Sequence, residues 1–165
     1  MSKNEHLIVI PLEPLKTGEQ FIEWPLHITI VPWFGVEESR AQELDDLLLE
    51  IASRHLPIEA KVGRVAMFGA HHDISVNLIQ PNPALDVLHQ DVFDSLEKCG
   101  FAIHQKEWLD ENYKPHIAWQ GGKHCAEGQE MQIAKFALIK QTRQKVTGTM
   151  VKELAKEYQL GENAA

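Results

Sequence analysis

The sequence lacks the features that mark membrane and secreted proteins. No apolar run approaches the roughly 20 residues that a membrane-spanning helix needs. The first residues, Met1–Glu5, lack the charged stretch followed by an apolar stretch that is typical of a signal peptide. Cysteine is scarce: Cys99 and Cys125 are the only two, and no CxxC spacing relates them. We therefore expect a cytoplasmic protein with no membrane association, whose two thiols are separate rather than paired in a disulfide.

Positive charge is also in short supply. The chain has 16 Lys and Arg residues against 24 Asp and Glu residues, which gives a formal net charge of -8. A protein that binds long nucleic acid through many phosphates normally carries a basic patch. If nucleic acid is a partner, the charge balance therefore predicts contact with a strand end or a small nucleotide.

Length and composition are those of an ordinary globular domain. A chain of 165 residues is long enough for one domain with a proper core, and a hydrophobic fraction of 44% supplies that core. It is too short for two independent domains of usual size. We expect a single domain over 1–165, with two lobes, and a monomer.

The stretch Pro25–Trp33 organises the chain. It is a β-branched, apolar run bracketed by prolines, and this composition predicts a strand. Side chains alternate between the two faces of a strand, so His27 and Thr29 share one face while Ile28 and Ile30 share the other. One face suits a core, and the other presents an imidazole beside a hydroxyl.

A similar stretch follows at Tyr113–Trp119. A proline again precedes a histidine, His116, which opens a short apolar strand that contains Ala118. Two strands that each carry one inward histidine indicate a site built between two related halves.

The rest of the chain alternates strands with two amphipathic segments. Strands are predicted over 7–12, 58–68, 74–79, 101–103 and 131–140, and 13–24 is a loop or a short extended piece. A helix is predicted over 37–56, with two acidic residues in its first turn and Pro57 beyond its end. A second helix is predicted from the cap Asn82 to the stop Gly100. The histidine strand is expected to end at Pro32 and Gly35. Residues 149–160 fit a helix by propensity and a strand by alternation.

The two motifs, His27-Ile28-Thr29 and Pro115-His116-Ile117-Ala118, resemble those of the 2H phosphoesterase superfamily, whose best-known branch is the 2'-5' RNA ligase-like proteins. That family carries two His-x-Thr/Ser motifs, each on a strand. The resemblance spans roughly residues 7–160. It implies an α+β, bilobal, pseudo-duplicated fold with two antiparallel sheets facing a central groove and helices on the outer faces. It also favours a strand over 150–160.

The second motif departs from the family pattern at Ala118, where Thr or Ser is usual. The hydroxyl would hold a phosphate oxygen, so its absence removes one donor and leaves activity weakened, redirected or absent. By alternation, Lys114 and Gln120 share the face of His116 and are candidates to replace that donor.

The family chemistry needs two imidazoles. Hydrolysis of a cyclic phosphodiester requires a base for the attacking water and an acid for the departing sugar oxygen, and His27 and His116 fit these roles near neutral pH. Because the two oxygens lie on opposite sides of phosphorus, we expect the rings on opposite walls of the groove. Thr29 would donate to a nonbridging oxygen. The mechanism requires no metal or other cofactor. Which histidine is the base and which is the acid depends on whether the product keeps a 2'-phosphate or a 3'-phosphate.

Aromatic residues next to the motifs are candidates to stack a base. Trp33 and Tyr113 are assigned to substrate binding together with Thr29, Ala118 and Lys114, and Trp119 is assigned to the core. Arg64 and Lys123 are further candidates for phosphate contacts. His71-His72-Asp73 is interpreted as a solvated turn, and His124-Cys125 as a plain loop.

Three functions are compatible with these residues. The first is a metal-independent phosphodiesterase acting on 2',3'-cyclic or 2',5'-linked phosphodiesters of RNA ends or small nucleotides. The second is a non-catalytic nucleotide or RNA-end binding module, which the missing hydroxyl at position 118 favours. The third is a metal-dependent hydrolase, for which the sequence shows no proper ligand spacing.

Overall fold

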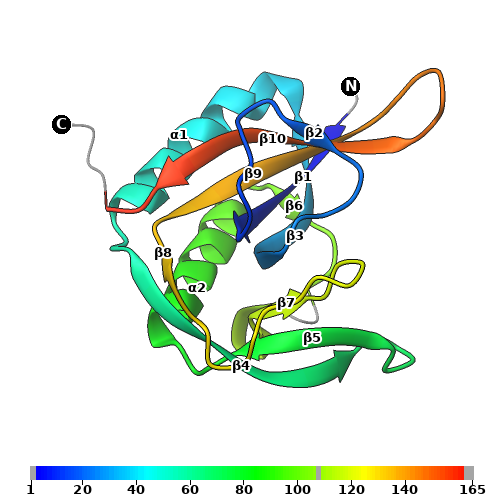
Figure 1. The fold of residues 1–165 in the computed structure, drawn as a ribbon. Helices are drawn as coiled ribbons and strands as arrows, with labels where there is room; N and C mark the ends of the chain where they lie inside the picture. The colour runs from blue at the N-terminus through cyan, green and yellow to red at the C-terminus, as the bar shows by residue number, and fades with distance from the viewer. Residues whose placement is uncertain (1–2, 107–108, 162–165) are drawn as a thin grey trace.

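The computed structural model describes residues 3–106 and 109–161. The predicted domain over 1–165 begins and ends outside this part, since its first two and last four residues are not described. The chain forms a ten-stranded sheet and two α-helices (Figure 1), which confirms the predicted α+β class. The helices are α1 (Ala41–Ser53) and α2 (Pro83–Lys98). The strands are β1 (Lys3–Pro11), β2 (Gln20–Phe21), β3 (His27–Glu37), β4 (Ile58–Phe68), β5 (Ile74–Ile79), β6 (Ala102–Ile103), β7 (His116–Ala118), β8 (Glu130–Ile133), β9 (Lys135–Arg143) and β10 (Met150–Gln159).

The strands follow one antiparallel path rather than two separate sheets. Their order is β2-β10-β9-β1-β3-β7-β5-β4-β8, with β6 attached to β3. The first five strands and the last four are joined where β3 pairs with β7, through the residue pair Ile28 and Ile117. The two strands that carry the motif histidines are therefore hydrogen-bonded neighbours. Within the described residues, only one residue pair joins these strands, so the placement of the two rings on opposite walls of a groove stays a prediction.

Helix α2 forms as predicted. The side chain of Asn82 accepts a hydrogen bond from the main-chain N–H of Leu85 at 3.1 Å, and Pro83 occupies the first turn. The helix stops before Gly100, whose φ of 79° lies in the left-handed region that glycine adopts without a steric penalty.

Helix α1 is shorter than the predicted 37–56. β3 extends to Glu37, which pairs with Lys3, and the next three residues form a 3₁₀ turn, η1 (Glu38–Arg40). The helix then begins at Ala41 and ends at Ser53. Of the two acidic residues predicted in the first turn of this helix, Glu37 is therefore in β3 and Glu38 is in the 3₁₀ turn. Among the described residues, neither helix is long and apolar enough to cross a membrane.

β3 is longer than predicted, because Pro32 and Gly35 do not end it. Its pairing register with β1 shifts between His6 and Ile8 and again between Ile8 and Val9, so β3 is bulged in this region. A bulge frees backbone groups from the ladder, and proline is tolerated there because it has no N–H to pair. The strand can therefore continue through Pro32.

In the C-terminal half, one predicted strand is divided into two, and one of two predicted alternatives is confirmed. The predicted strand 131–140 is two strands, because β8 pairs with β4 while β9 pairs with β1 and β10. The strand alternative for 149–160 is confirmed, since β10 pairs with β9 over most of its length and with β2 at Lys152 and Glu153. β4 and β5 form the predicted antiparallel pair.

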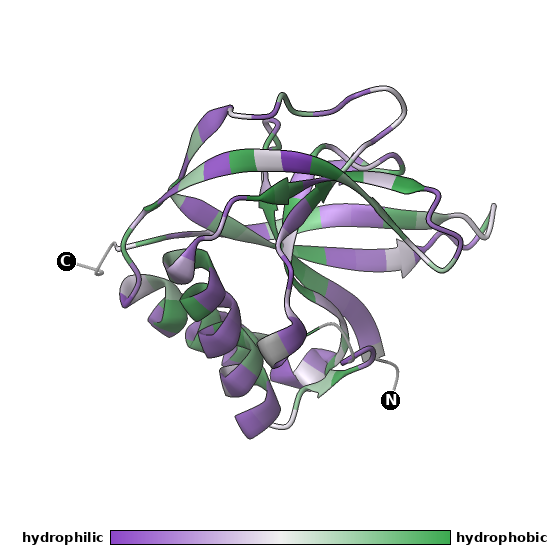
Figure 2. Cartoon of the chain, turned by 90° about the horizontal axis from the view of Figure 1, so that it is seen from below, coloured by the Kyte–Doolittle hydropathy of each residue, from purple (hydrophilic) through white to green (hydrophobic). Residues whose placement is uncertain are grey.

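Both helices cover the same face of the sheet (Figure 2) and bury the main core there. Apolar residues of α1, α2 and the sheet interior are almost inaccessible, for example Leu48, Leu88 and Ile28. The opposite face carries a smaller group of buried residues, here named the second cluster: Leu7, Val9, Ala137, Ile139 and Leu154. Leu15, Phe21, Trp24 and Trp33 pack against the second cluster.

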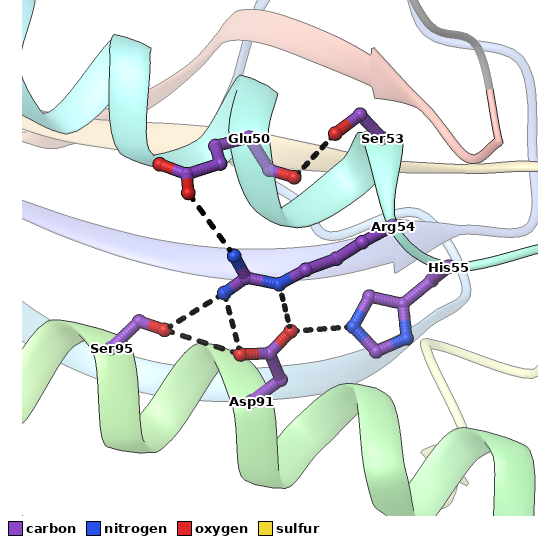
Figure 3. A network of polar contacts seen from close by, with 6 residues as sticks. All are labelled: Glu50, Ser53, Arg54, His55, Asp91 and Ser95. Atoms are coloured by element: carbon purple, nitrogen blue, oxygen red, sulfur yellow. Dashed lines mark hydrogen bonds and ion pairs between the residues drawn. The ribbon is translucent and has the colours of Figure 1, made fainter.

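An ion-pair network joins α2 to the end of α1 (Figure 3). The guanidinium of Arg54 donates to both carboxylate oxygens of Asp91 at 2.8 Å, and His55 contacts the same carboxylate at 2.6 Å. The two hydrogen bonds from Arg54 form a bidentate pair, the stronger geometry for a guanidinium and a carboxylate. The network holds the two helices together on the core side of the sheet.

Candidate active site

The pairing of β3 with β7 brings the two motifs side by side. Ile28 is directly opposite Ile117, and both side chains are fully buried in the main core. In an antiparallel pair, continuing this register places Thr29 opposite His116 and His27 opposite Ala118. All four side chains point away from the core side, so they share one face of the sheet.

Neighbouring strands confirm which face this is. Val9 of β1 pairs with Thr29, and Val9 belongs to the second cluster. Residues paired across strands share a face, so both motifs lie on the side of the second cluster, away from the helices. We name it the histidine face. His27 and His116 are diagonal neighbours on this face. Diagonal neighbours on adjacent strands lie about 7–8 Å apart, which leaves space for a phosphate between the two imidazoles.

Each motif histidine is held by the same local hydrogen bond. Nδ1 of His27 lies 2.8 Å from the carbonyl oxygen of Pro25, and Nδ1 of His116 lies 2.8 Å from the carbonyl oxygen of Lys114. A carbonyl only accepts, so Nδ1 carries the proton in both rings. In the neutral rings Nε2 is then the acceptor, the form that a general base needs.

Each imidazole also packs against an aromatic ring. Trp24 lies on His27 with ring centroids 4.5 Å apart, and Phe68 meets His116 edge-on at 4.7 Å. These contacts limit rotation of the imidazoles. No sequence signal marks either aromatic residue as a partner of a histidine: Trp24 lies in a segment predicted as a loop or a short extended piece, and Phe68 ends a strand that is far from either motif in the sequence.

Burial makes both histidines weaker bases than free histidine. Desolvation lowers the pKa of His27, the hydrogen bond to Pro25 opposes this effect, and the charge of His116 lowers the pKa further. Desolvation also lowers the pKa of His116, against the hydrogen bond to Lys114. Both rings are therefore mainly neutral at pH 7. A bound phosphate favours the protonated form and raises these pKa values.

Tyr113 contacts the first motif rather than only flanking the second. Its hydroxyl donates a 2.7 Å hydrogen bond to the carbonyl oxygen of Thr29. One face of its ring is stacked on His89 of α2, with centroids 3.7 Å apart and planes inclined by 7°. Burial raises the pKa of Tyr113, so the phenol stays a donor. The predicted role of Tyr113 in stacking a base stays a prediction.

The sequence predicts a structural or surface position for His89. It is buried, with Nδ1 2.7 Å from the carbonyl oxygen of Ile30, and its Nε2 accepts the main-chain N–H of Asp110 at 3.0 Å. Together, Tyr113 and His89 bind two successive carbonyl groups of β3 in its bulged region. No periodicity in the sequence signals this contact between α2 and β3.

The remaining predicted substrate-binding residues occupy different places. Lys114 is exposed, and Ala118 is half-buried beside His27 on the histidine face. Gln120 pairs with Lys123 across a turn, and Lys123 also forms an ion pair with Glu13 at 2.8 Å. Trp33 packs against the second cluster on the far part of β3, so it is not brought next to His27.

The other histidines do not assemble a metal centre within the described part of the chain, where no three His, Cys, Asp or Glu side chains gather in a group suited to a metal ion. His71 and His72 are exposed in the turn between β4 and β5, as predicted. His124 stacks on Trp119 at 4.5 Å. Trp119 is half-buried and donates its indole N–H to Asn77, and Arg64 is exposed.

Sequence and structure comparisons identify relatives of the chain. Residues 10–145 match the family model of the 2'-5' RNA ligase superfamily. An RNA 2',3'-cyclic phosphodiesterase of Bacillus subtilis (strain 168) is 28% identical over 117 residues, which cover 66% of this chain and 61% of the relative. The chain thus spans less than two thirds of that relative's length.

Solved structures share the fold. The crystal structure of TT0787 of Thermus thermophilus matches with a TM-score of 0.69 at 15% identity, covering 95% of this chain and 98% of that chain. Escherichia coli LigT in complex with 3'-AMP matches with a TM-score of 0.67 at 14% identity, covering 97% and 99%. With the family match over most of its length, the chain belongs to the 2'-5' RNA ligase superfamily, within the 2H phosphoesterases that its two histidine motifs resemble.

Proposed function

We propose that this protein is a metal-independent phosphodiesterase that hydrolyses 2',3'-cyclic or 2',5'-linked phosphodiesters at RNA ends or in small nucleotides. The observation that carries the proposal is the register of β3 and β7. It sets His27, Thr29 and His116 on one face, with the Nδ1 of each imidazole engaged by a main-chain carbonyl.

The reaction needs one neutral and one protonated imidazole. Nε2 of the neutral ring takes a proton from water while the water oxygen attacks phosphorus. The bond between phosphorus and the leaving sugar oxygen breaks, and that oxygen receives the proton from Nε2 of the second ring. The diagonal arrangement of His27 and His116 provides the two sides that an in-line displacement requires.

The protonated imidazole is supplied by substrate binding. Burial lowers the pKa of both histidines, so the free protein near pH 7 holds few protons on them. A phosphodiester anion between the rings raises their pKa values by its opposite charge. Binding of the substrate thereby protonates one ring and prepares the acid.

In the proposed mechanism, Thr29 stabilises the charge that develops on phosphorus oxygens. Its strand position is opposite His116, and its carbonyl is fixed by Tyr113, which leaves its side chain on the histidine face. At the equivalent place beside His27, Ala118 provides no donor. The proposed enzyme therefore has one side-chain hydroxyl where two are usual in its family.

The named relatives support the substrate class. The Bacillus subtilis relative is an RNA 2',3'-cyclic phosphodiesterase. Escherichia coli LigT has been crystallised in complex with 3'-AMP, with NADP+ and with ATP, so a protein of this fold accepts nucleotides. These observations favour a small nucleotide or an RNA terminus as the ligand here.

We also propose that the two lobes are related by duplication. The support is local: each motif opens a strand with a histidine, and each histidine uses Nδ1 to bond the carbonyl two residues earlier. Each half also contributes one helix to the core. The single-domain, monomeric and cytoplasmic assignments stay predictions.

A substrate panel tests the proposal. Purified protein is incubated with 2',3'-cyclic mononucleotides, 2',5'-linked dinucleotides and 3',5'-linked dinucleotides, with and without EDTA. EDTA-resistant hydrolysis of a cyclic or 2',5'-linked substrate is expected, and the product phosphate identifies the base. Hydrolysis that EDTA abolishes and a divalent metal restores contradicts the proposal.

A second candidate function follows from Ala118. If the missing hydroxyl has removed efficient chemistry, the protein is a nucleotide-binding module that keeps the histidine face. Nucleotide binding that depends on Thr29, without turnover on any member of the panel, establishes this alternative.

A further inference from the structure

A cavity of about 330 Å3 lies beyond the two motifs. Its lining residues are Glu5, Pro32, Trp33, His104, Gln105 and Gln141. The volume falls in the range of small-molecule sites. Neither motif histidine lines it, so the proposed mechanism does not account for it.

The cavity opens on the histidine face. Glu5 of β1 pairs with Gln141 of β9 in the same uninterrupted register that pairs Val9 with Ala137, a pair in the second cluster. Alternation along β1 keeps Glu5 and Val9 on one face, and Val9 pairs with Thr29. Glu5 lies four positions from Val9 along β1, so the end of the cavity that Glu5 lines is about 13 Å from Thr29.

The lining is suited to a nucleobase rather than to a phosphate. It contains a carboxylate and no Lys or Arg, and the carboxylate of Glu5 is bonded to Nε2 of His104 at 2.7 Å. An anionic phosphate is disfavoured beside this carboxylate. The indole of Trp33 offers a surface for a base, and the amides of Gln105 and Gln141 each supply donors and an acceptor.

We propose that this cavity binds the base of the nucleotide next to the one that carries the reacting phosphate. The distance from Thr29 is too great for the base of the reacting nucleotide and is within reach of its neighbour. The inference rests on the proposed function, because it takes the histidine face as the phosphate site. It makes an oligonucleotide end, rather than a mononucleotide, the preferred substrate.

Binding of product analogues tests the subsite separately from catalysis. Calorimetry compares the Kd of a dinucleotide 3'-phosphate with that of the corresponding mononucleotide 3'-phosphate. The wild-type protein is expected to bind the dinucleotide roughly tenfold more tightly, the contribution of one stacked base. Equal Kd values contradict the subsite, whether or not the protein hydrolyses any substrate.

Two matched pairs of variants test whether the cavity residues cause the preference for the dinucleotide. Gln105→Ala is expected to reduce the dinucleotide preference by roughly two- to tenfold, the loss of one hydrogen bond. Its control is Gln132→Ala, which removes another exposed glutamine from a second cavity, near β4 and β8, and is expected to leave the preference unchanged. Trp33→Leu is expected to remove most of the preference, while Trp33→Phe, which keeps an aromatic face, retains it.

The outcomes separate the two proposals. A preference that Gln105→Ala and Gln132→Ala lower equally, or that Trp33→Leu leaves intact, overturns the subsite. A preference that follows the cavity residues supports the subsite even in a protein without turnover. Failure of every substrate in the panel overturns only the catalytic proposal.

Discussion

The hydroxyl of Tyr113 donates a 2.7 Å hydrogen bond to the main-chain carbonyl of Thr29. Tyr113 lies three residues before His116, so the approach to the second motif fixes the backbone of the first. His89 reinforces this contact, because it stacks on Tyr113 and bonds the next carbonyl of β3, that of Ile30. The relative position of the two motifs therefore depends on more than the short β3–β7 pairing.

Tyr113→Phe tests whether this hydrogen bond positions Thr29. We expect a loss of roughly 0.5–1.5 kcal/mol in the free energy of unfolding and a several-fold lower kcat, with a smaller effect on KM. Tyr158→Phe is the matched control, since its hydroxyl bonds Asp45 at 2.9 Å, away from both motifs. Urea unfolding and steady-state kinetics measure the two effects. An equal fall of kcat in both variants would show that Tyr113 acts only through stability.

Ala118→Thr tests the missing donor of the second motif. Continuing the register of Ile28 and Ile117 puts position 118 opposite His27 on the histidine face, so we expect a hydroxyl there to reach the phosphate site. A hydrogen bond to a charged group contributes roughly 1.5–3 kcal/mol, and we expect kcat/KM to rise about tenfold or more. Ala118→Val supplies the same shape without the hydroxyl. If Val and Thr have the same effect, the hydroxyl plays no part.

Much of the fold follows from local sequence signals. Asn82, Pro83 and Gly100 mark α2 because capping is a short-range interaction between a side chain and nearby N–H groups. The errors occur where tertiary pairing decides. Pro32 remains inside β3 because β1 pairs with a bulged strand. Glu37 joins β3 instead of α1 because Lys3, far away in the chain, is its partner.

In the site, too, local sequence signals predict some features, and tertiary pairing decides the others. The motifs identify His27, Thr29 and His116 because alternation places each side chain on one face of its strand. Alternation does not reveal that Ile28 and Ile117 are partners, so the direct pairing of the motifs was not predicted. Trp24 and Phe68 were missed for the same reason, since each meets its histidine through tertiary contacts.

The pH dependence of turnover follows from the lowered pKa values of His27 and His116. The kcat/KM profile reports the free protein, in which both values lie below 6.5, so its maximum is expected below pH 6.5. The kcat profile reports the complex, in which phosphate raises both values, so its maximum is expected at higher pH. Initial rates on a 2',3'-cyclic nucleotide give both profiles. A kcat/KM maximum above about pH 7.5 is inconsistent with the histidine assignment.

The pair of Arg54 and Asp91 predicts how stability depends on pH. The hydrogen bonds from Arg54 lower the pKa of Asp91 from 3.8 to about 2. A lowered carboxyl pKa contributes stability above about pH 4 that is lost as the pH falls toward 2. We expect Asp91→Asn to cost roughly 1–2 kcal/mol at pH 7 and progressively less between pH 4 and pH 2.

Asp94→Asn is the control for this prediction, because Asp94 is on the same helix but is exposed and accepts a hydrogen bond from Gln90. Urea denaturation at several pH values compares the two variants with the wild-type protein. A cost of Asp91→Asn that stays constant from pH 7 to pH 2 contradicts the role of its ionised carboxylate.

Hydrolysis of a 2',3'-cyclic nucleotide by His27→Ala and His116→Ala, in the presence of EDTA, tests the two-histidine mechanism. Each substitution is expected to lower kcat by roughly 10²–10⁴-fold, since each removes one proton-transfer group. Urea unfolding, measured alongside, confirms that both variants remain folded. A folded variant that keeps more than about a tenth of the wild-type turnover contradicts the two-histidine mechanism.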